Sequence, residues 1–216
     1  LADWYDTRLS HVRPVDDWHK ASGRIYRIKP EGSAPAYRIG DLTQKKGVEL
    51  LGLLEHPNRW VRRRAVLEIG WQNKRSLLPS LVKKVAANEG QASLESLWAL
   101  SLLGGLEEKL ALEWLEHKDP HLRRWVVRLL GDKRTISDTL TNALQALAKR
   151  EKDLEGLIQL AASAKRFPSG QGLPILQTLT ERSENSSDKH LPLMIWWGLE
   201  SHCETGRTIL RDWYRK

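Results

Sequence analysis

The sequence contains a single cysteine, Cys203, among its 216 residues. One cysteine excludes a disulfide within the chain and a zinc site built from several cysteines, and it leaves the redox compartment open. Long hydrophobic runs are missing too, because none reaches the ~18 apolar residues that a helix needs to cross a bilayer. The longest candidate, Leu191 to Leu199, is interrupted by Pro192 and Gly198. No signal peptide is visible, and since the first residue is not methionine we expect a piece of a longer protein.

The common motifs of catalytic and cofactor sites are also missing. The sequence has no glycine-rich phosphate loop, nucleophile elbow, HExxH zinc motif or Cys-x-x-Cys-His haem motif. Its histidines are scattered, and His56 and His117 occupy equivalent turns before prolines, where we expect them to cap helices. We therefore predict no catalytic residue, no metal site and no cofactor.

What the sequence does contain is a repeated helix-start signal. A polar turn, a proline, arginines and apolar residues at helical spacing occur at Pro57 and again at Pro120, which are 63 positions apart. This separation corresponds to two units of about 32 residues, and a fixed period of that size is typical of solenoids. Leucine is abundant whereas phenylalanine and methionine occur once each, as in helical proteins.

The predicted fold class is all-α: an α-α superhelix, a HEAT-like solenoid of about five helix pairs, with a short N-terminal non-helical segment. The second helices of the pairs are expected to start near residues 58, 91, 121, 153 and 190. Glycines are expected to end two of them, at Gly104-Gly105 and at Gly131. The polar stretch Ser183 to Lys189 is expected to be a mobile loop. These patterns predict two domains, an N-terminal segment over residues 1–40 and the solenoid over residues 41–216.

The N-terminal segment differs from the rest in having strand-like residues. Ile25, Tyr26 and Ile28 lie between Gly23 and Pro30, which is the pattern of one short strand. A lone strand is not stable in water. We therefore expect it to pair with something outside the chain or to lie against the solenoid.

The net charge of +8 raises the question of phosphate binding. The candidate interaction surface consists of six arginines on two of the predicted second helices: Arg59, Arg62, Arg63, Arg123, Arg124 and Arg128. Arginine forks match phosphate oxygens. The favoured alternative is that these arginines cap the preceding helix or pair with turn carboxylates such as Asp119, which would connect neighbouring repeats.

Tryptophan is unusually frequent, with ten residues. Trp60 and Trp125 occupy matching places in the two motif copies, and Trp98, Trp196 and Trp197 fall on corresponding helices. Aromatic side chains can stack on bases. Their recurrence at equivalent repeat positions fits packing better, so we predict that they are packing anchors.

The turn-proline-arginine-alanine pattern from about Asp41 to Arg215 resembles HEAT repeats of the short, bilin-lyase-like type. In addition, Asp3-Trp4-Tyr5-Asp6, Gly23-Arg24-Ile25-Tyr26-Arg27-Ile28 and the His56 to Arg62 motif resemble a linked series in planctomycete-type membrane-bound dehydrogenases. In that family a sorbosone/glucose-dehydrogenase-like β-propeller runs into HEAT repeats and then a c-type haem domain. The resemblance implies that residues 1–40 are the last piece of a propeller. It also implies a periplasmic or other extracytoplasmic location and a dehydrogenase parent, although it assigns no activity to this chain.

The sequence therefore predicts a non-catalytic helical-repeat scaffold for protein–protein or interdomain contacts within a larger redox protein. Its partners would be other domains of the parent chain or another protein, bound on the concave surface that the second helices line. The alternative is a protein of the DNA-glycosylase type that binds the phosphate backbone of nucleic acid through a basic helical-repeat surface. A third class, a bilin-lyase-like protein that assists an enzyme, would take up a pigment or cofactor.

Overall fold

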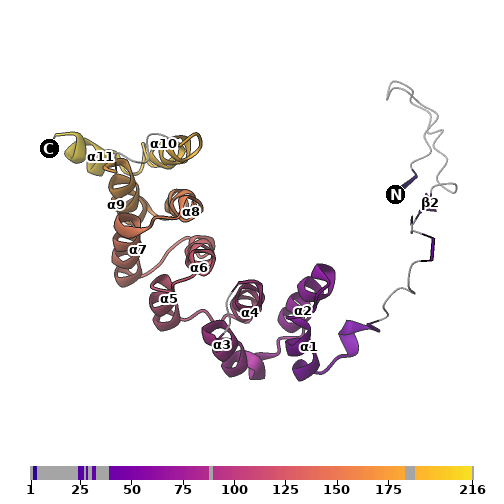
Figure 1. Ribbon diagram of the computed structural model, residues 1–216. Coiled ribbons are helices and arrows are strands. Elements are labelled where there is room, and N and C mark those ends of the chain that lie inside the picture. Colours follow the sequence, from indigo (N-terminus) through magenta and orange to yellow (C-terminus); the bar gives the residue numbers. More distant parts are fainter. Residues whose placement is uncertain are drawn as a thin grey trace, which may run out of the picture. The chain divides into compact units, whose positions relative to one another are not determined.

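The computed structural model describes residues 2–3, 24–26, 28, 31–32, 39–87, 90–182 and 188–215. Contacts divide the chain into two units, residues 1–40 and residues 41–216. Helices that pack in consecutive pairs make up most of the second unit (Figure 1), which confirms the predicted all-α superhelix.

Within the described part of the second unit the helices form two layers and a terminal helix (Figure 1). The outer layer consists of α1 (Gly47–Leu53), α3 (Leu78–Ala87), α5 (Glu108–Leu115), α7 (Asp138–Arg150) and α9 (Ser169–Thr180). The inner layer consists of α2 (Arg59–Trp71), α4 (Gln91–Leu102), α6 (Pro120–Asp132), α8 (Leu154–Ala164) and α10 (Leu191–Ser201). Two short 3₁₀ helices, η1 (Leu42–Gln44) and η2 (Arg75–Leu77), precede α1 and α3, and α11 (Arg207–Tyr214) follows α10. Each inner helix packs against the inner helix that follows it in the chain.

Side-chain caps start the inner helices at the repeated motif. Asn58 accepts a hydrogen bond from the backbone N–H of Trp60, and Asp119 accepts one from the N–H of His121, both at 2.9 Å. These bonds satisfy one of the N–H groups that a helix start leaves without a partner. Five inner helices begin within about one residue of the predicted positions because such start signals are local in the sequence.

The histidines of the two motif copies are also structural. His56 Nδ1 accepts from the backbone N–H of Asn58 at 3.0 Å, and His117 Nδ1 accepts from that of Asp119 at 3.1 Å. Each ring thus holds the residue that caps the following helix. The two histidines are therefore structural, although the residues that cap the helices are Asn58 and Asp119.

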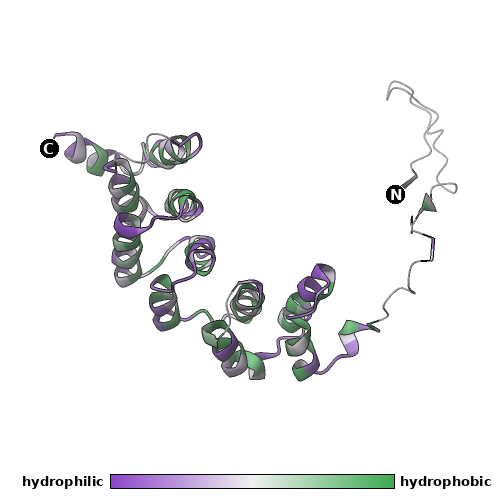
Figure 2. Cartoon of the chain, viewed as in Figure 1, coloured by the Kyte–Doolittle hydropathy of each residue, from purple (hydrophilic) through white to green (hydrophobic). Residues whose placement is uncertain are grey.

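The core lies between the two layers and between neighbouring inner helices. Its largest fully buried side chains include Trp114 of α5, Leu130 of α6 and Leu144 of α7. Burying one such side chain contributes about 1.5–3 kcal/mol. Figure 2 shows that hydrophobic and hydrophilic residues alternate along the helices of both layers, as expected when each helix buries only part of its surface.

The prediction that Gly131 ends the sixth helix is wrong, because α6 continues to Asp132. A Cβ atom at position 131 would lie 2.6 Å from Ser163 Oγ and 2.8 Å from Ser163 Cβ. Ser163 also donates a hydrogen bond across the same contact, to the carbonyl oxygen of Val127 at 3.0 Å. Gly131 is therefore needed for the close approach of α6 and α8, and it does not stop the helix.

The first unit contains a short strand pair, β1 (Ala2–Asp3) and β2 (Arg24–Ile25), which are antiparallel with Ala2 opposite Ile25. The strand expected around Ile25 thus finds a partner, β1, within its own segment, which sequence reasoning missed. The propeller interpretation concerns residues that lie largely outside the described ones. Of the loop expected to be mobile, residues 183–187 also lie outside them. Asp188 Oδ1 accepts from the backbone N–H groups of His190 at 2.8 Å and Leu191 at 2.6 Å, at the start of α10.

Candidate functional site

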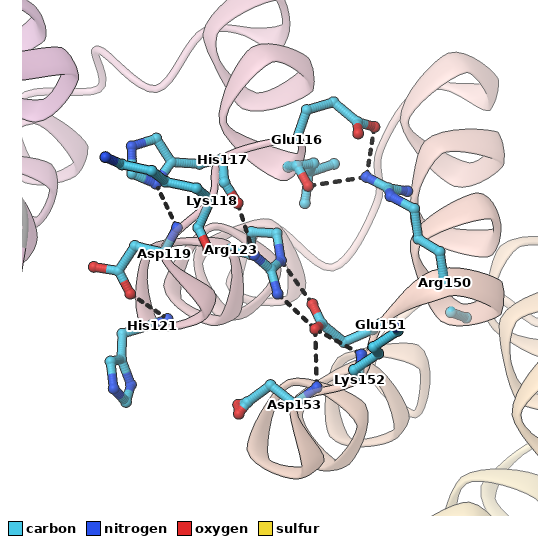
Figure 3. Close-up of polar contacts among 12 residues, drawn as sticks. Glu116, His117, Lys118, Asp119, His121, Arg123, Arg150, Glu151, Lys152 and Asp153 are labelled. Carbon is cyan, nitrogen blue, oxygen red and sulfur yellow. Dashed lines mark hydrogen bonds and ion pairs between the residues drawn. The ribbon is translucent and has the colours of Figure 1, made fainter.

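Arg123 connects two repeats through its whole guanidinium group (Figure 3). Its Nη1 donates to the carbonyl oxygens of His117 at 2.7 Å and Lys118 at 3.1 Å, in the turn before its own helix. Its Nε and Nη2 donate to Glu151 Oε2 at 2.8 Å and Oε1 at 2.6 Å, in the turn between α7 and α8. A bidentate ion pair of this kind is both strong and directional.

The partner carboxylate, Glu151, is almost completely buried, with 2% of its surface exposed. Its Oε1 also accepts from the backbone N–H groups of Lys152 at 2.9 Å and Asp153 at 3.0 Å. Burial acts to raise the pKa of Glu151, but the hydrogen bonds from Arg123 and Asp153 outweigh it and the net pKa is lowered from 4.5. The hydrogen bond to Glu151 in turn raises the pKa of Arg123. The pair is therefore ionised at neutral pH.

This lowered pKa predicts a defined pH dependence of stability. A carboxyl group whose pKa is lower in the folded state stabilises the fold fully above its unfolded pKa of about 4.5, and the contribution is lost as the pH falls through the folded pKa. Glu151→Gln is therefore expected to cost about 2 kcal/mol at pH 7, as for a hydrogen bond to a charged group. The difference from the wild type should shrink below about pH 4. Urea unfolding at a series of pH values measures it, and a difference that is independent of pH would contradict the assignment.

Arg62 makes a similar connection two pairs earlier in the solenoid. Its Nη1 donates to the carbonyl oxygens of His56 at 2.8 Å and Pro57 at 3.0 Å. Its Nε donates to Glu95 Oε1 at 3.1 Å, on α4. Unlike Glu151, however, Glu95 has its second oxygen, Oε2, buried with no hydrogen-bond partner among the described residues.

The other four arginines of the predicted surface have more exposed surroundings. Arg124 pairs with Glu155 of α8 at 2.9 Å, and Arg128 pairs with Asp132 at 3.5 Å. Arg59 and Arg63 are exposed on α2, and within the described part of the chain neither forms an ion pair. The predicted pairing with Asp119 is not seen, because that side chain caps α6 instead.

Further basic side chains bind backbone carbonyl oxygens near the ends of helices, which sequence reasoning missed. Arg75 Nη1 donates to the carbonyl of Leu103 at 2.9 Å. Lys133 Nζ does the same to Leu106 at 2.9 Å, and Arg150 Nη2 to Leu115 at 3.1 Å (Figure 3 shows Arg150). Leu103 and Leu115 lie at the C-terminal ends of α4 and α5, where carbonyl groups have no intrahelical partner, so two of these bonds satisfy such groups. Much of the positive charge is thus used within the fold.

Comparison of the chain with protein-family models, curated proteins and solved structures finds no match. The resemblances to HEAT repeats and to a dehydrogenase parent therefore remain predictions from the quoted motifs. The functional argument depends on the geometry of the helices.

Two adjoining hollows lie on the inner layer. The first, here called the apolar hollow, has a volume of about 310 Å³ and is lined by Arg63, Val66 and Leu67 of α2, Glu95 and Trp98 of α4, and Trp125 of α6. The second, the polar hollow, has a volume of about 300 Å³ and is lined by Arg124, Trp125 and Arg128 of α6 and Glu155, Ile158 and Gln159 of α8. Trp125 lines both, so the two hollows adjoin at this residue, and together they are here called the groove.

The tryptophans divide into two groups. Trp98 and Trp125 are half-buried and pack edge to face, with ring centroids 4.8 Å apart and an interplanar angle of 68°. This arrangement is favourable for aromatic pairs. Trp60, Trp196 and Trp197 are instead 63%, 60% and 47% exposed, so the prediction that they are packing anchors is wrong for these three.

The exposure of Trp60 follows from the two apolar faces of α2. Val61 and Ile69 are buried on one face. At 100° per residue, Trp60, Leu67 and Trp71 lie on the opposite face, and all three are exposed. Helix α2 therefore presents an apolar surface that no other described helix covers.

The described residues contain no group of three or more His, Cys, Asp or Glu side chains arranged to hold a metal ion. None of their helices is long and apolar enough to cross a membrane.

Proposed function

We propose that this chain is a non-catalytic helical-repeat scaffold whose inner face binds a protein segment. The observation that carries the proposal is the apolar hollow, where Leu67, Trp98 and Trp125 line a surface open to solvent. Keeping apolar area in water costs about 25 cal/mol per Å². Concave apolar surfaces of this kind mark interaction sites in soluble proteins.

The use of the arginines favours protein over nucleic acid as the partner. Arg62 and Arg123 donate their hydrogen bonds to carbonyl oxygens of turns and to buried glutamates. A binder of the phosphate backbone needs several cations that are free to replace counterions. Of the six predicted arginines, Arg59 and Arg63 are the exposed ones without an ion pair among the described residues, and two cations supply little of that energy.

The parent context is part of the proposal. The resemblance of the sequence to planctomycete-type dehydrogenases supports a place between a propeller and a haem domain of an extracytoplasmic redox protein. In such a protein the solenoid would hold domains or a partner at a fixed separation. A measurable turnover of a sugar or an aldehyde by this chain alone would contradict the non-catalytic part.

The choice between protein and nucleic acid can be tested with the purified chain. We expect it to bind members of an array of random peptides, and to lose binding to a DNA duplex at ~150 mM salt because few phosphates would be contacted. Retention of the duplex at that salt, with no peptide bound, would favour the nucleic-acid alternative.

A further inference from the structure

We propose that the groove binds an acidic peptide segment, with one aromatic or large aliphatic side chain of the peptide inserted in the apolar hollow. This inference rests on the proposed protein-docking function and specifies its partner. Three features of the groove carry it: an apolar wall, two polar atoms without partners, and an excess of arginine.

The apolar wall determines the anchor. Leu67 and Val66 of α2 face Trp98 and Trp125 across a volume of about 310 Å³. This volume is at the lower end of the range for binding pockets, so it has room for one large side chain and not for a folded element. Aromatic side chains buried in such pockets are the residues that dominate the energy of protein interfaces.

The polar atoms indicate that the anchor is part of a peptide. Glu95 Oε2 is an acceptor and Trp98 Nε1–H is a donor, and both are buried without a hydrogen-bond partner among the described residues. They lie three positions apart on α4, hence on one face of the helix. A buried polar group without a partner is unfavourable, because it has lost its hydrogen bonds to water and gained none in return. A peptide unit offers one N–H and one C=O, and so could satisfy both.

The contrast with the other repeat shows that this is a local feature. Glu151 uses both oxygens, for Arg123 and for two backbone N–H groups. Glu95 occupies the corresponding role towards Arg62 but uses Oε1 alone, for Arg62 and for Gln91 at 2.7 Å. In the connection between repeats both oxygens of Glu151 are therefore hydrogen-bonded, whereas one oxygen of Glu95, which lines the groove, has no partner among the described residues.

The charges of the groove determine the sign of the charge on the peptide. Among the charged residues that line the two hollows, three arginines stand against Glu95 and Glu155, a net charge of +1. Arg63 lies on one side of Trp125 in this groove, and Arg124 and Arg128 lie on the other. The side chain of Glu155 is 67% exposed, so its ion pair with Arg124 is weak and can be replaced by a carboxylate of the peptide.

The spacing of the helices sets the length of the peptide. Packed helices lie about 8–10 Å apart, so the distance from α2 to α6 is about 16–20 Å. An extended chain covers it with about six residues at ~3.3 Å each. Acidic residues are therefore expected on both sides of the anchor, within about three positions of it.

The test uses a fluorescein-labelled peptide, Gly-Asp-Glu-Asp-Trp-Asp-Glu-Asp-Gly, and the full chain, with binding followed by fluorescence anisotropy. We expect binding to weaken at least tenfold when the central tryptophan of the peptide is replaced by serine, and likewise when lysines replace its acidic residues. Arg63→Glu and Leu67→Glu should weaken it at least tenfold. The matched control is Arg59→Glu, an exposed arginine on the same helix that does not line either hollow and should change affinity by about twofold or less at ~150 mM salt.

Several results would overturn the proposal. Equal weakening by Arg59→Glu and Arg63→Glu would mean that only net charge matters. Stronger binding of the lysine peptide would mean that the partner is basic and not acidic. Stronger binding of a single-stranded oligonucleotide would mean that the partner is a nucleic acid and not a protein. If the array of random peptides selects sequences whose affinity is unchanged by Arg63→Glu and Leu67→Glu, the groove is not the binding site, but the proposed protein-docking function is retained. If the array selects no peptide at all, both fail.

Discussion

Replacing Arg123 by alanine is expected to lower the free energy of unfolding by about 3–5 kcal/mol, because removal of one partner leaves a buried charge without compensation. The stranded group is the carboxylate of Glu151, which is 2% exposed. The carbonyl oxygens of His117 and Lys118 lose a donor at the same time. Urea unfolding followed by circular dichroism measures the loss.

The matched control for this experiment is the neighbouring arginine. Arg124→Ala removes an ion pair to the exposed Glu155 and is expected to cost about 1 kcal/mol or less. A double-mutant cycle of Arg123 with Glu151 should give a large coupling energy, since both residues form one hydrogen-bonded unit. Similar small losses for Arg123→Ala and Arg124→Ala would refute the role of Arg123 as the connection between repeats.

Two glycines of α9 are expected to respond to alanine in opposite directions. A Cβ at Gly172 would lie 2.3 Å from the carbonyl oxygen of Ala164 and 2.6 Å from His202 Nε2. The ring nitrogen and that carbonyl are themselves 3.1 Å apart, so the methyl group would also separate a hydrogen-bonded pair. Gly172→Ala is therefore expected to destabilise the protein by about 1–3 kcal/mol, as overpacking of a core does.

Gly170, two positions earlier, provides the control. A Cβ there would meet nothing within 4 Å. Since alanine favours helix over glycine by up to about 1 kcal/mol, Gly170→Ala is expected to raise stability by about 0.5–1 kcal/mol. Thermal unfolding of the two variants compares them. If both variants were destabilised, or if neither were, the close packing of α9 against Ala164 and His202 would be contradicted.

The helices and their starts could be predicted from the sequence because the signals that set them are local. Asn58 and Asp119 accept hydrogen bonds from backbone N–H groups two residues further on, and the histidines of the same turns bind the N–H groups of these two cap residues. Apolar residues at helical spacing fill the core regardless of what the next repeat contributes. The all-α superhelix follows from these features and the period.

The partners of the arginines could not be predicted, because they are distant and not equivalent in the sequence. Arg62 reaches Glu95, 33 positions away and inside helix α4, whereas Arg123 reaches Glu151, 28 positions away in a turn. Two copies of one motif therefore use glutamates from different elements. The spacing of the motif copies alone could not show that both oxygens of Glu151 form hydrogen bonds while Oε2 of Glu95 has no partner among the described residues.

The groove could not be predicted either, because helix α2 is apolar on two faces. Periodicity identifies Val61 and Ile69 as one stripe and Trp60, Leu67 and Trp71 as another, but it does not tell which stripe a neighbouring helix covers. Packing settles the question: the first stripe is buried and the second is exposed. Recurrence of tryptophan at equivalent positions therefore predicted burial where the solenoid leaves exposed surface.

The central claim is that the inner layer docks a protein segment. Amide hydrogen exchange with and without the acidic tryptophan peptide measures this docking most directly. Binding is expected to slow exchange in α2, α4 and α6, whose residues line the apolar hollow, and to leave α3, α5 and α7 unchanged. Slower exchange confined to the outer helices, or an unchanged pattern at saturating peptide, would contradict it.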